Sequence, residues 1–189
     1  MRLDHIAYRV KDRYKTAKFF ESTLGYTIAT EFKIEFSDGT NADCLALIPS
    51  EKRSMEIEDW SMNINPGLIS FPPKPGFTLH APPEIFISDG LEGSIVGEWV
   101  KERNDVGGIH HLAYQVDDVE KTMKEWKDKG YVEFLTDKPL TCEEPKLTQV
   151  FSKPSELTGV IYELITRSDT KGFCEKNTKQ LMESTINTI

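Results

Sequence analysis

Two histidines occupy equivalent positions in a repeated stretch of the chain, and together they could bind a metal ion. Residues 3–16 read LDHIAYRVKDRYKT and residues 109–122 read IHHLAYQVDDVEKT, so His5 aligns with His111 at a constant offset (111 − 5 = 106). Each histidine lies in an alternating pattern typical of a β-strand, on the face opposite the strongly apolar side chains. If the two copies pair about a pseudo-twofold axis, both imidazoles enter one cavity.

Two glutamates could complete such a site. Glu163 in GVIYELIT alternates with apolar neighbours, and Glu84 in PPEIFISD is expected to have the same register (163 − 84 = 79). We expect His5, His111 and Glu163 as ligands, with Glu84 as a further ligand or as a catalytic base. Two histidines and one carboxylate with open positions suit iron(II), which we favour, while cobalt, nickel, manganese and zinc fit the same donors. His110 has the opposite parity and is expected to pack or hydrogen-bond rather than to bind the metal.

Each copy continues from its strand into a helix and further strands, so each predicts a βαβββ module. The helix of the first copy is expected to end at Gly25 and that of the second at Gly130, since glycine often follows a helix C-terminus. The two modules together predict an α+β fold. Further strands are expected at about 26–36, 43–48, 131–136, 147–152 and 159–166.

The two halves differ in what is added to them. The predicted organisation is a first module over residues 1–90 with a long loop insertion at about 49–82, a linking helix over 91–107, a second module over 108–167, and a C-terminal lid segment and helix over 168–189. Long insertions of this kind are often functional.

Composition excludes several classes of function. The chain has 189 residues, with 23 Lys and Arg against 31 Asp and Glu, which gives a net charge of −8. Such an acidic chain is a poor candidate for binding nucleic acid or an anionic membrane. Cys44, Cys142 and Cys174 are odd in number and form no CxxC pair, so we expect neither a zinc knuckle nor a disulfide framework. Without a signal peptide or membrane span, a cytoplasmic location is the expectation.

These features together resemble the vicinal oxygen chelate superfamily, which includes glyoxalase I, methylmalonyl-CoA epimerase and the extradiol and 4-hydroxyphenylpyruvate dioxygenases. The paired βαβββ units, the early histidine in each and the late glutamate carry the resemblance over nearly the whole chain. It implies an incomplete barrel around a metal site. It also implies that His5, His111 and Glu163 are the ligands, joined by Glu84 in members that use four.

The C-terminal part resembles the catalytic domain of 4-hydroxyphenylpyruvate dioxygenase. LTQVFSKP is similar to a segment that carries a pocket glutamine and phenylalanine there, matching Gln149 and Phe151. The run ITRSDTKGFCEKNTKQLMES resembles the segment that closes that active site, with Phe173 as its phenylalanine. This implies an iron(II) dioxygenase acting on a small-molecule 2-oxo acid, with Gln149 orienting the substrate and the two phenylalanines lining its pocket.

Other features resemble methylmalonyl-CoA epimerase instead. The stretch between His111 and Glu163 is short (163 − 111 = 52), His110 stands where the dioxygenase has a glutamine, and Glu84 is expected in ligand register. The alternative is therefore a metal-dependent epimerase, isomerase or lyase, in which a carboxylate moves a proton beside a polarised carbonyl. A third class is a non-enzymatic binding protein of the bleomycin-resistance type. A homodimer is a further expectation for this fold.

Overall fold

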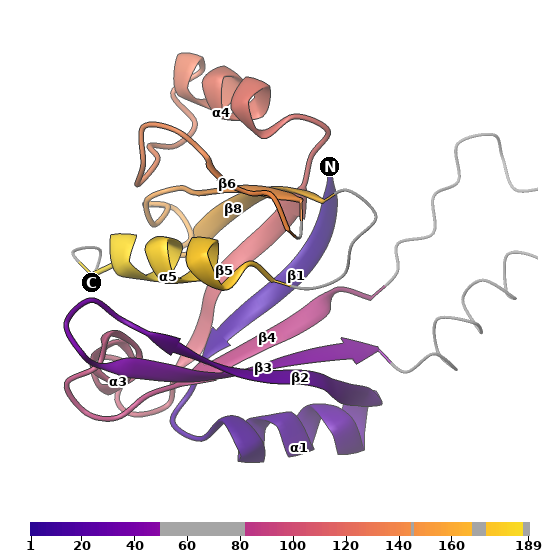
Figure 1. The fold of residues 1–189 in the computed structure, drawn as a ribbon, viewed down its shortest axis with the longest axis vertical. Coiled ribbons are helices and arrows are strands. Elements are labelled where there is room, and N and C mark those ends of the chain that lie inside the picture. Colours follow the sequence, from indigo (N-terminus) through magenta and orange to yellow (C-terminus); the bar gives the residue numbers. More distant parts are fainter. Residues whose placement is uncertain (50–81, 145, 168–172, 187–189) are drawn as a thin grey trace, which may run out of the picture.

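The computed structural model describes residues 1–49, 82–144, 146–167 and 173–186. Within them, eight strands form one curled sheet that is accompanied by four helices (Figure 1). The elements of the first half are β1 (Arg2–Arg9), α1 (Arg13–Leu24), β2 (Tyr26–Glu35), β3 (Asn41–Pro49) and β4 (Glu84–Asp89), followed by α3 (Ile95–Lys101). Those of the second half are β5 (Gly108–Gln115), α4 (Val119–Asp128), β6 (Leu140–Cys142), β7 (Leu147–Phe151) and β8 (Ile161–Arg167), followed by α5 (Glu175–Ser184).

The strand order β2-β3-β4-β1-β5-β8-β7-β6 places the two repeated strands at the centre of the sheet. β1 and β5 pair antiparallel, with His5 opposite Ala113 and Ala7 opposite His111. This reciprocal pairing is what a local twofold axis between the two strands produces. Outside them, β4 runs parallel to β1 and β8 runs parallel to β5, so the α+β fold of paired halves is confirmed.

The helices α1 and α4 begin in the same way because the repeat gives them the same capping residue. The side chain of Asp12 accepts a hydrogen bond from the backbone N–H of Lys15, and Asp118 does the same for Lys121. An aspartate at this position satisfies an N–H that the helix itself leaves unpaired. Gly25 then ends α1 in the left-handed conformation, with φ of 71°.

The sheet has two differently covered faces. On one face, Phe20 of α1 and Met123 of α4 pack in two separate apolar clusters of the core. On the other face, α5 crosses the concave side of the sheet between its two halves (Figure 1). Ile6 and Tyr8 pack in the α1 cluster, while Ala7 packs in the cluster that contains Met182 of α5. The prediction from strand alternation that His5 faces the concave side of the sheet is therefore confirmed.

One predicted strand does not form. Residues 131–136 contain a single bridge, from Phe134 to Ser152, and the edge strand is β6 instead. The ring of Phe134 packs beside that of Trp126 in α4, with centroids 6.5 Å apart, so this segment folds back toward the helix. The loop insertion expected at 49–82 lies almost wholly outside the described residues, as does the segment 168–172 of the expected lid.

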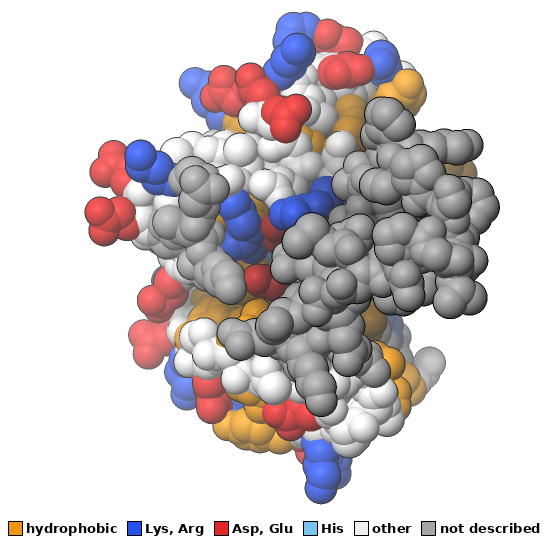
Figure 2. Space-filling model, turned by 90° about the vertical axis from the view of Figure 1, so that its right-hand side faces the viewer, with side chains coloured by type: hydrophobic (Ala, Val, Ile, Leu, Met, Phe, Trp, Pro, Cys, Tyr) orange, Lys and Arg blue, Asp and Glu red, His pale blue; other side chains and the backbone are white. Residues whose placement is uncertain are grey.

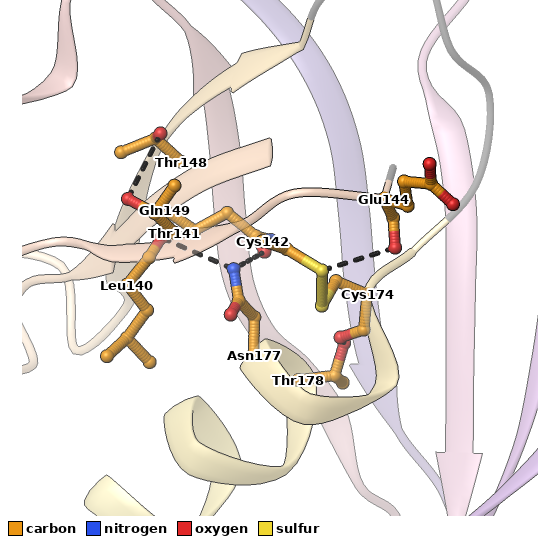
Figure 3. Close-up of a disulfide and its surroundings, with 9 residues drawn as sticks. All are labelled: Leu140, Thr141, Cys142, Glu144, Thr148, Gln149, Cys174, Asn177 and Thr178. Atoms are coloured by element: carbon orange, nitrogen blue, oxygen red, sulfur yellow. Dashed lines mark hydrogen bonds between the residues drawn. A yellow bond between two sulfur atoms is a disulfide. The ribbon is translucent and has the colours of Figure 1, made fainter. Parts of the chain in front are cut away.

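The cysteines also differ from expectation. Cys142 and Cys174 form a disulfide across 32 residues of sequence, which ties the end of β6 to the residue before α5 (Figure 3). The prediction of no disulfide is wrong because the two residues meet only after α5 folds back over the second half. Cys44 is a buried free thiol. The expectation of a cytoplasmic location loses the support that it drew from unpaired cysteines.

The face shown in Figure 2 carries charges of both signs. Figure 2 shows acidic and basic side chains interspersed over the described part of one face, with neither sign dominating. In the described part of the chain, no helix is both long and apolar enough to cross a membrane.

Candidate metal centre

Three buried side chains from three central strands converge on the concave face. The Nε2 atoms of His5 and His111 lie 3.3 Å apart, and Oε2 of Glu163 lies 3.3 Å from the first and 3.2 Å from the second. The three residues are 2%, 7% and 1% exposed, respectively. Among the described residues they form the one group of three or more potential metal ligands whose atoms lie within 4.8 Å of one another.

These separations fit a shared metal ion. At bond lengths of about 2.0–2.2 Å, two ligand atoms lie about 3.0 Å apart at a right angle and about 3.4 Å apart at a tetrahedral angle. The observed distances of 3.2 and 3.3 Å fall between these values. Two neutral imidazoles and a carboxylate are also the donor set that divalent iron, manganese, cobalt, nickel and zinc accept. The residues present therefore fit a divalent cation.

Strand register explains why these residues meet. His5 and Glu163 both lie opposite Ala113, one on each side of it, in neighbouring strands of the sheet. Ala113 is fully buried and Ala7, opposite His111, is 2% exposed. Because each alanine side chain is small, it leaves room above the sheet for the larger groups beside it.

Each histidine is oriented by the residue that precedes it in the sequence. Nδ1 of His5 lies 2.8 Å from Oδ1 of Asp4, and Nδ1 of His111 lies 2.8 Å from Nδ1 of His110. Asp4 in turn accepts hydrogen bonds from the guanidinium of Arg167. Partners of this kind fix the ring so that the other nitrogen faces the metal.

The glutamate is oriented by the second half and by α5. Nε2 of Gln149 donates to Oε1 of Glu163 at 2.7 Å, which leaves Oε2 facing the two histidines. Nδ2 of Asn177 in α5 donates to Oε1 of Gln149 at 3.3 Å and to the carbonyl oxygen of Leu140 at 3.2 Å (Figure 3). Gln149 therefore contacts the Glu163 carboxylate in this structure.

Burial and charge act differently on the two imidazoles. Burial disfavours the charged form of His5, but the Glu163 carboxylate and the hydrogen bond to Asp4 outweigh it and raise the His5 pKa to about 9. The pKa of His111 is lowered, since burial there outweighs the effect of Glu163. Burial acts to raise the pKa of Glu163, but the two imidazoles overcome it and lower that pKa well below its usual range. The Glu163 side chain is therefore an anionic carboxylate at neutral pH.

Glu84 lies outside this group. The parallel pairing of β1 with β4 sets Glu84 opposite His5 and Phe86 opposite Ala7. In the second half, Ala113 is the repeat equivalent of Ala7 and lies opposite Glu163. The repeat equivalent of Glu163 is therefore Phe86, and the expected register of Glu84 was wrong by two residues. Two residues along a strand return to the same face, so side-chain parity could not reveal this shift.

A cavity lies between α5 and the three converging side chains of His5, His111 and Glu163. Gln149 and Phe151 line it from β7, and Phe173 and Leu181 line it from the C-terminal segment. The ring of Phe173 lies 5.2 Å from that of His5 and separates this cavity from a second one. Glu84 lines the second cavity. The free space of the first is about 20 Å³, which is room for a water molecule or an ion.

Sequence analysis did not single out four polar residues of this site. Arg9 lines the cavity, and the other three support its side chains: Asp4 contacts His5, Arg167 contacts Asp4, and Asn177 contacts Gln149. A signal was present for Asp4, since it takes the position before His5 that His110 takes before His111. Arg9 also shares the parity of His5 on β1. No local pattern marks Asn177 and Arg167, which reach the site from the C-terminal part of the chain.

Comparison with known proteins supports the family resemblance. The sequence pattern of the glyoxalase/bleomycin resistance protein/dioxygenase superfamily matches residues 4–141. Among curated protein sequences, none is significantly similar to this chain.

Solved structures share the fold at low sequence identity. A variant of 4-hydroxymandelate synthase from Streptomyces coelicolor is 19% identical over 97% of this chain and 52% of its own, with a TM-score of 0.70. The present chain thus spans about half the length of that protein. A methylmalonyl-CoA epimerase is 20% identical over 89% of this chain and 97% of its own, with a TM-score of 0.60. The epimerase from Mycobacterium tuberculosis is 17% identical over 88% of each chain, with a TM-score of 0.58.

The family pattern spans more than half of the chain and includes two of the three converging residues, His5 and His111. The third, Glu163, follows on the strand that the paired halves bring beside them. The chain therefore belongs to the glyoxalase/bleomycin resistance protein/dioxygenase superfamily.

Proposed function

We propose that this protein is an iron(II)-dependent dioxygenase that acts on a 2-oxo acid. The observation that carries this proposal is the number of ligands. His5, His111 and Glu163 converge, whereas the repeat equivalent of Glu163 in the first half is Phe86, which cannot bind a metal. Among the described residues, the site thus offers three protein ligands rather than four.

The ligand count distinguishes the two main chemistries. Three protein ligands leave three positions of a six-coordinate ion, which is the number that a bidentate 2-oxo acid and O₂ need together. A ferrous ion held there would supply the redox chemistry that couples decarboxylation of the 2-oxo acid to reduction of O₂. A site that only polarises a carbonyl for proton transfer has no need of so many open positions.

The chain's own residues would position and shield this reaction. Asp4 and His110 hold the two imidazoles, and Gln149 holds Glu163 so that one oxygen faces the metal position. Gln149 thus acts as a positioning residue. Phe151 and Phe173 are the apolar walls nearest the histidines, with ring centroids 4.6 Å from His111 and 5.2 Å from His5. Such walls exclude water from the reacting atoms.

The test is oxygen consumption by the iron(II)-loaded protein. The protein is purified without O₂ and loaded with iron(II), and O₂ uptake and CO₂ release are followed with a panel of alkyl and aryl 2-oxo acids. We expect at least one acid to give equal rates of both. No uptake with any acid, together with proton exchange on an acyl-CoA or a hemithioacetal under cobalt or nickel, would overturn the proposal in favour of an epimerase or lyase.

A variant at Phe86 tests the ligand count directly. Phe86→Glu offers a carboxylate at the repeat-equivalent position, so we expect metal binding to persist and O₂ uptake to fall by at least 100-fold. Phe86→Leu is the matched control, and its O₂ uptake should stay within about 3-fold of the wild type because the number of ligands is unchanged. Full uptake by a metal-loaded Phe86→Glu protein would contradict the argument.

A further inference from the structure

Arg9 is a buried cation for which the metal chemistry gives no role. It lies on β1, on the same concave face as His5, and is 1% exposed. It lines the cavity that His5, His111 and Glu163 also line. Within the described residues, no carboxylate lies within ion-pair distance of its guanidinium. Nη2 of Arg9 donates a hydrogen bond to Oγ1 of Thr185 at 3.1 Å, while Nε and Nη1 have no hydrogen-bond partner among the described residues. Those two atoms carry three of the five guanidinium N–H donors.

Such a group is costly unless something else pairs with it. An unpaired charge removed from water destabilises a fold by several kcal/mol, so buried cations are almost always matched by an anion. Burial lowers the Arg9 pKa to about 9, which still leaves the guanidinium charged at neutral pH. The natural partner of an unpaired guanidinium in the wall of a binding cavity is an anionic group of the ligand.

A second donor without a partner lies beside it. Arg9 and His110 pack against the same ring, with 5.8 Å from the guanidinium carbon of Arg9 to the Trp99 centroid and 5.7 Å between the His110 and Trp99 centroids. Nε2 of His110 is buried and has no partner. If His111 binds a metal through Nε2, its Nδ1 carries the proton and donates to Nδ1 of His110. His110 must then carry its own proton on Nε2, as an unused donor.

We propose that Arg9, assisted by His110, binds a second carboxylate of the substrate, so that the substrate is a 2-oxo acid with a distal carboxylate. The identification of the 2-oxo end rests on the proposed function, whereas the distal carboxylate rests on Arg9. A single carboxylate balances the single charge of Arg9, whereas a phosphate dianion would leave one charge unmatched, because no other Arg or Lys is among the described residues that line the cavity. The planar guanidinium also suits a carboxylate.

The cavity must open for such a substrate to enter. Its free space of about 20 Å³ is too small for an organic acid. One wall is α5, which contributes Thr178, Leu181 and Met182. Thr185, which accepts the hydrogen bond of Arg9, directly follows α5. A shift of α5 would therefore enlarge the cavity and release a further donor of Arg9 to the substrate.

The test compares acids that differ only in the distal carboxylate. Binding of 2-oxopentanedioate and of 2-oxopentanoate to the cobalt(II)-loaded protein is measured by calorimetry without O₂. The series also pairs 2-oxobutanedioate with 2-oxobutanoate and 2-oxohexanedioate with 2-oxohexanoate. For at least one of the three chain lengths, we expect the dicarboxylate to bind at least 10-fold more tightly than the monocarboxylate. A ratio near one for every pair in the wild type would overturn the inference without any variant.

Variants then identify the residue that causes the preference for the dicarboxylate. Arg9→Met should reduce the ratio to about one, and Arg9→Lys should keep part of it. Arg103→Met is the matched control, because Arg103 also stacks on Trp99, at 3.7 Å from the centroid, but does not line the cavity. Without ligand, the Tm of Arg9→Met should equal or exceed that of the wild type, since an unpaired buried charge is removed. A ratio that survives in Arg9→Met would overturn the assignment.

The inference and the proposed function can fail separately. Pentanoate and its neutral isostere pentanamide are compared on the metal-free protein, where no metal chemistry enters and the carboxylate can bind only through Arg9 and its neighbours. A preference for the carboxylate over the amide that Arg9→Met removes, combined with no O₂ uptake from any 2-oxo acid, keeps the Arg9 site and rejects the dioxygenase. O₂ uptake with monocarboxylic 2-oxo acids and no such preference keeps the dioxygenase and rejects the Arg9 site.

Discussion

The two halves of the sheet have the same backbone plan but supply different chemistry. Each places a histidine on its central strand, and each has a parallel outer neighbour whose side chains reach the same face. On that neighbour the second half has Glu163 and the first half has Phe86. Before the histidine, the first half has Asp4 and the second half His110. The two halves thus share the backbone geometry of the site, and single side chains set the number of potential ligands and the charge that each half contributes.

The largest expected effect separates the two equivalent positions on the outer strands. Glu163→Gln should weaken metal affinity by more than 100-fold, because it removes the one anionic ligand, while Phe86→Leu should change it by less than about 3-fold. Competition with a chromophoric chelator measures both. Equal losses in the two variants would mean that the halves do not differ as described.

A second effect, on stability rather than on metal affinity, concerns the attachment of α5, which is covalent to the second half and noncovalent to the first. Serine at Cys142 should lower the free energy of unfolding by about 3–4 kcal/mol, as expected for opening a loop of 32 residues. Denaturant titration measures it. A reductant should destabilise the wild type by the same amount and leave Cys142→Ser unchanged. A reductant effect that persists in the variant would show that another group is responsible.

A further effect on metal affinity is expected at Asp4 and His110, the residues that orient the two histidines. Asp4→Asn should weaken metal binding by about 10–100-fold, since it removes the carboxylate that orients His5 and increases its basicity. His110→Asn should have a smaller effect, because His111 has a neutral partner to begin with. Chelator competition at one pH ranks the two. The reverse ranking would show that His111 depends more strongly on its partner.

The smallest effect should be equal in both halves. Gly25 and Gly130 follow α1 and α4 with φ of 71° and 65°, a conformation that costs other residues about 1–2 kcal/mol. Gly25→Ala and Gly130→Ala should each lower the free energy of unfolding by about 1 kcal/mol. At Gly130 the added methyl group would meet no atom within 4 Å, so only backbone strain acts there. A much larger loss at one position would reveal packing that differs between the halves.

Much of the site was predictable because it depends on local periodicity. The alternation around His5 and His111 assigns both to one face, and the repeat predicts the twofold pairing that brings them together. Glu163 follows from the same parity. Glu84 did not, because its strand is separated from β1 by more than 70 residues and its register is set by pairing with β1 and β3. A shift of two residues leaves the alternation unchanged but exchanges Phe86 for Glu84 at the ligand position.

The sequence by itself determined the duplicated α+β architecture, the concave face and the convergence of His5, His111 and Glu163, because strand parity and helix capping act over a few neighbouring residues. Only the tertiary structure decided that Phe86 rather than Glu84 is the counterpart of Glu163, that Cys142 and Cys174 form a disulfide, and that no carboxylate among the described residues pairs with Arg9. These features depend on contacts between segments far apart in the chain. Such contacts are set by strand register and by the packing of α5, on which local patterns carry no information.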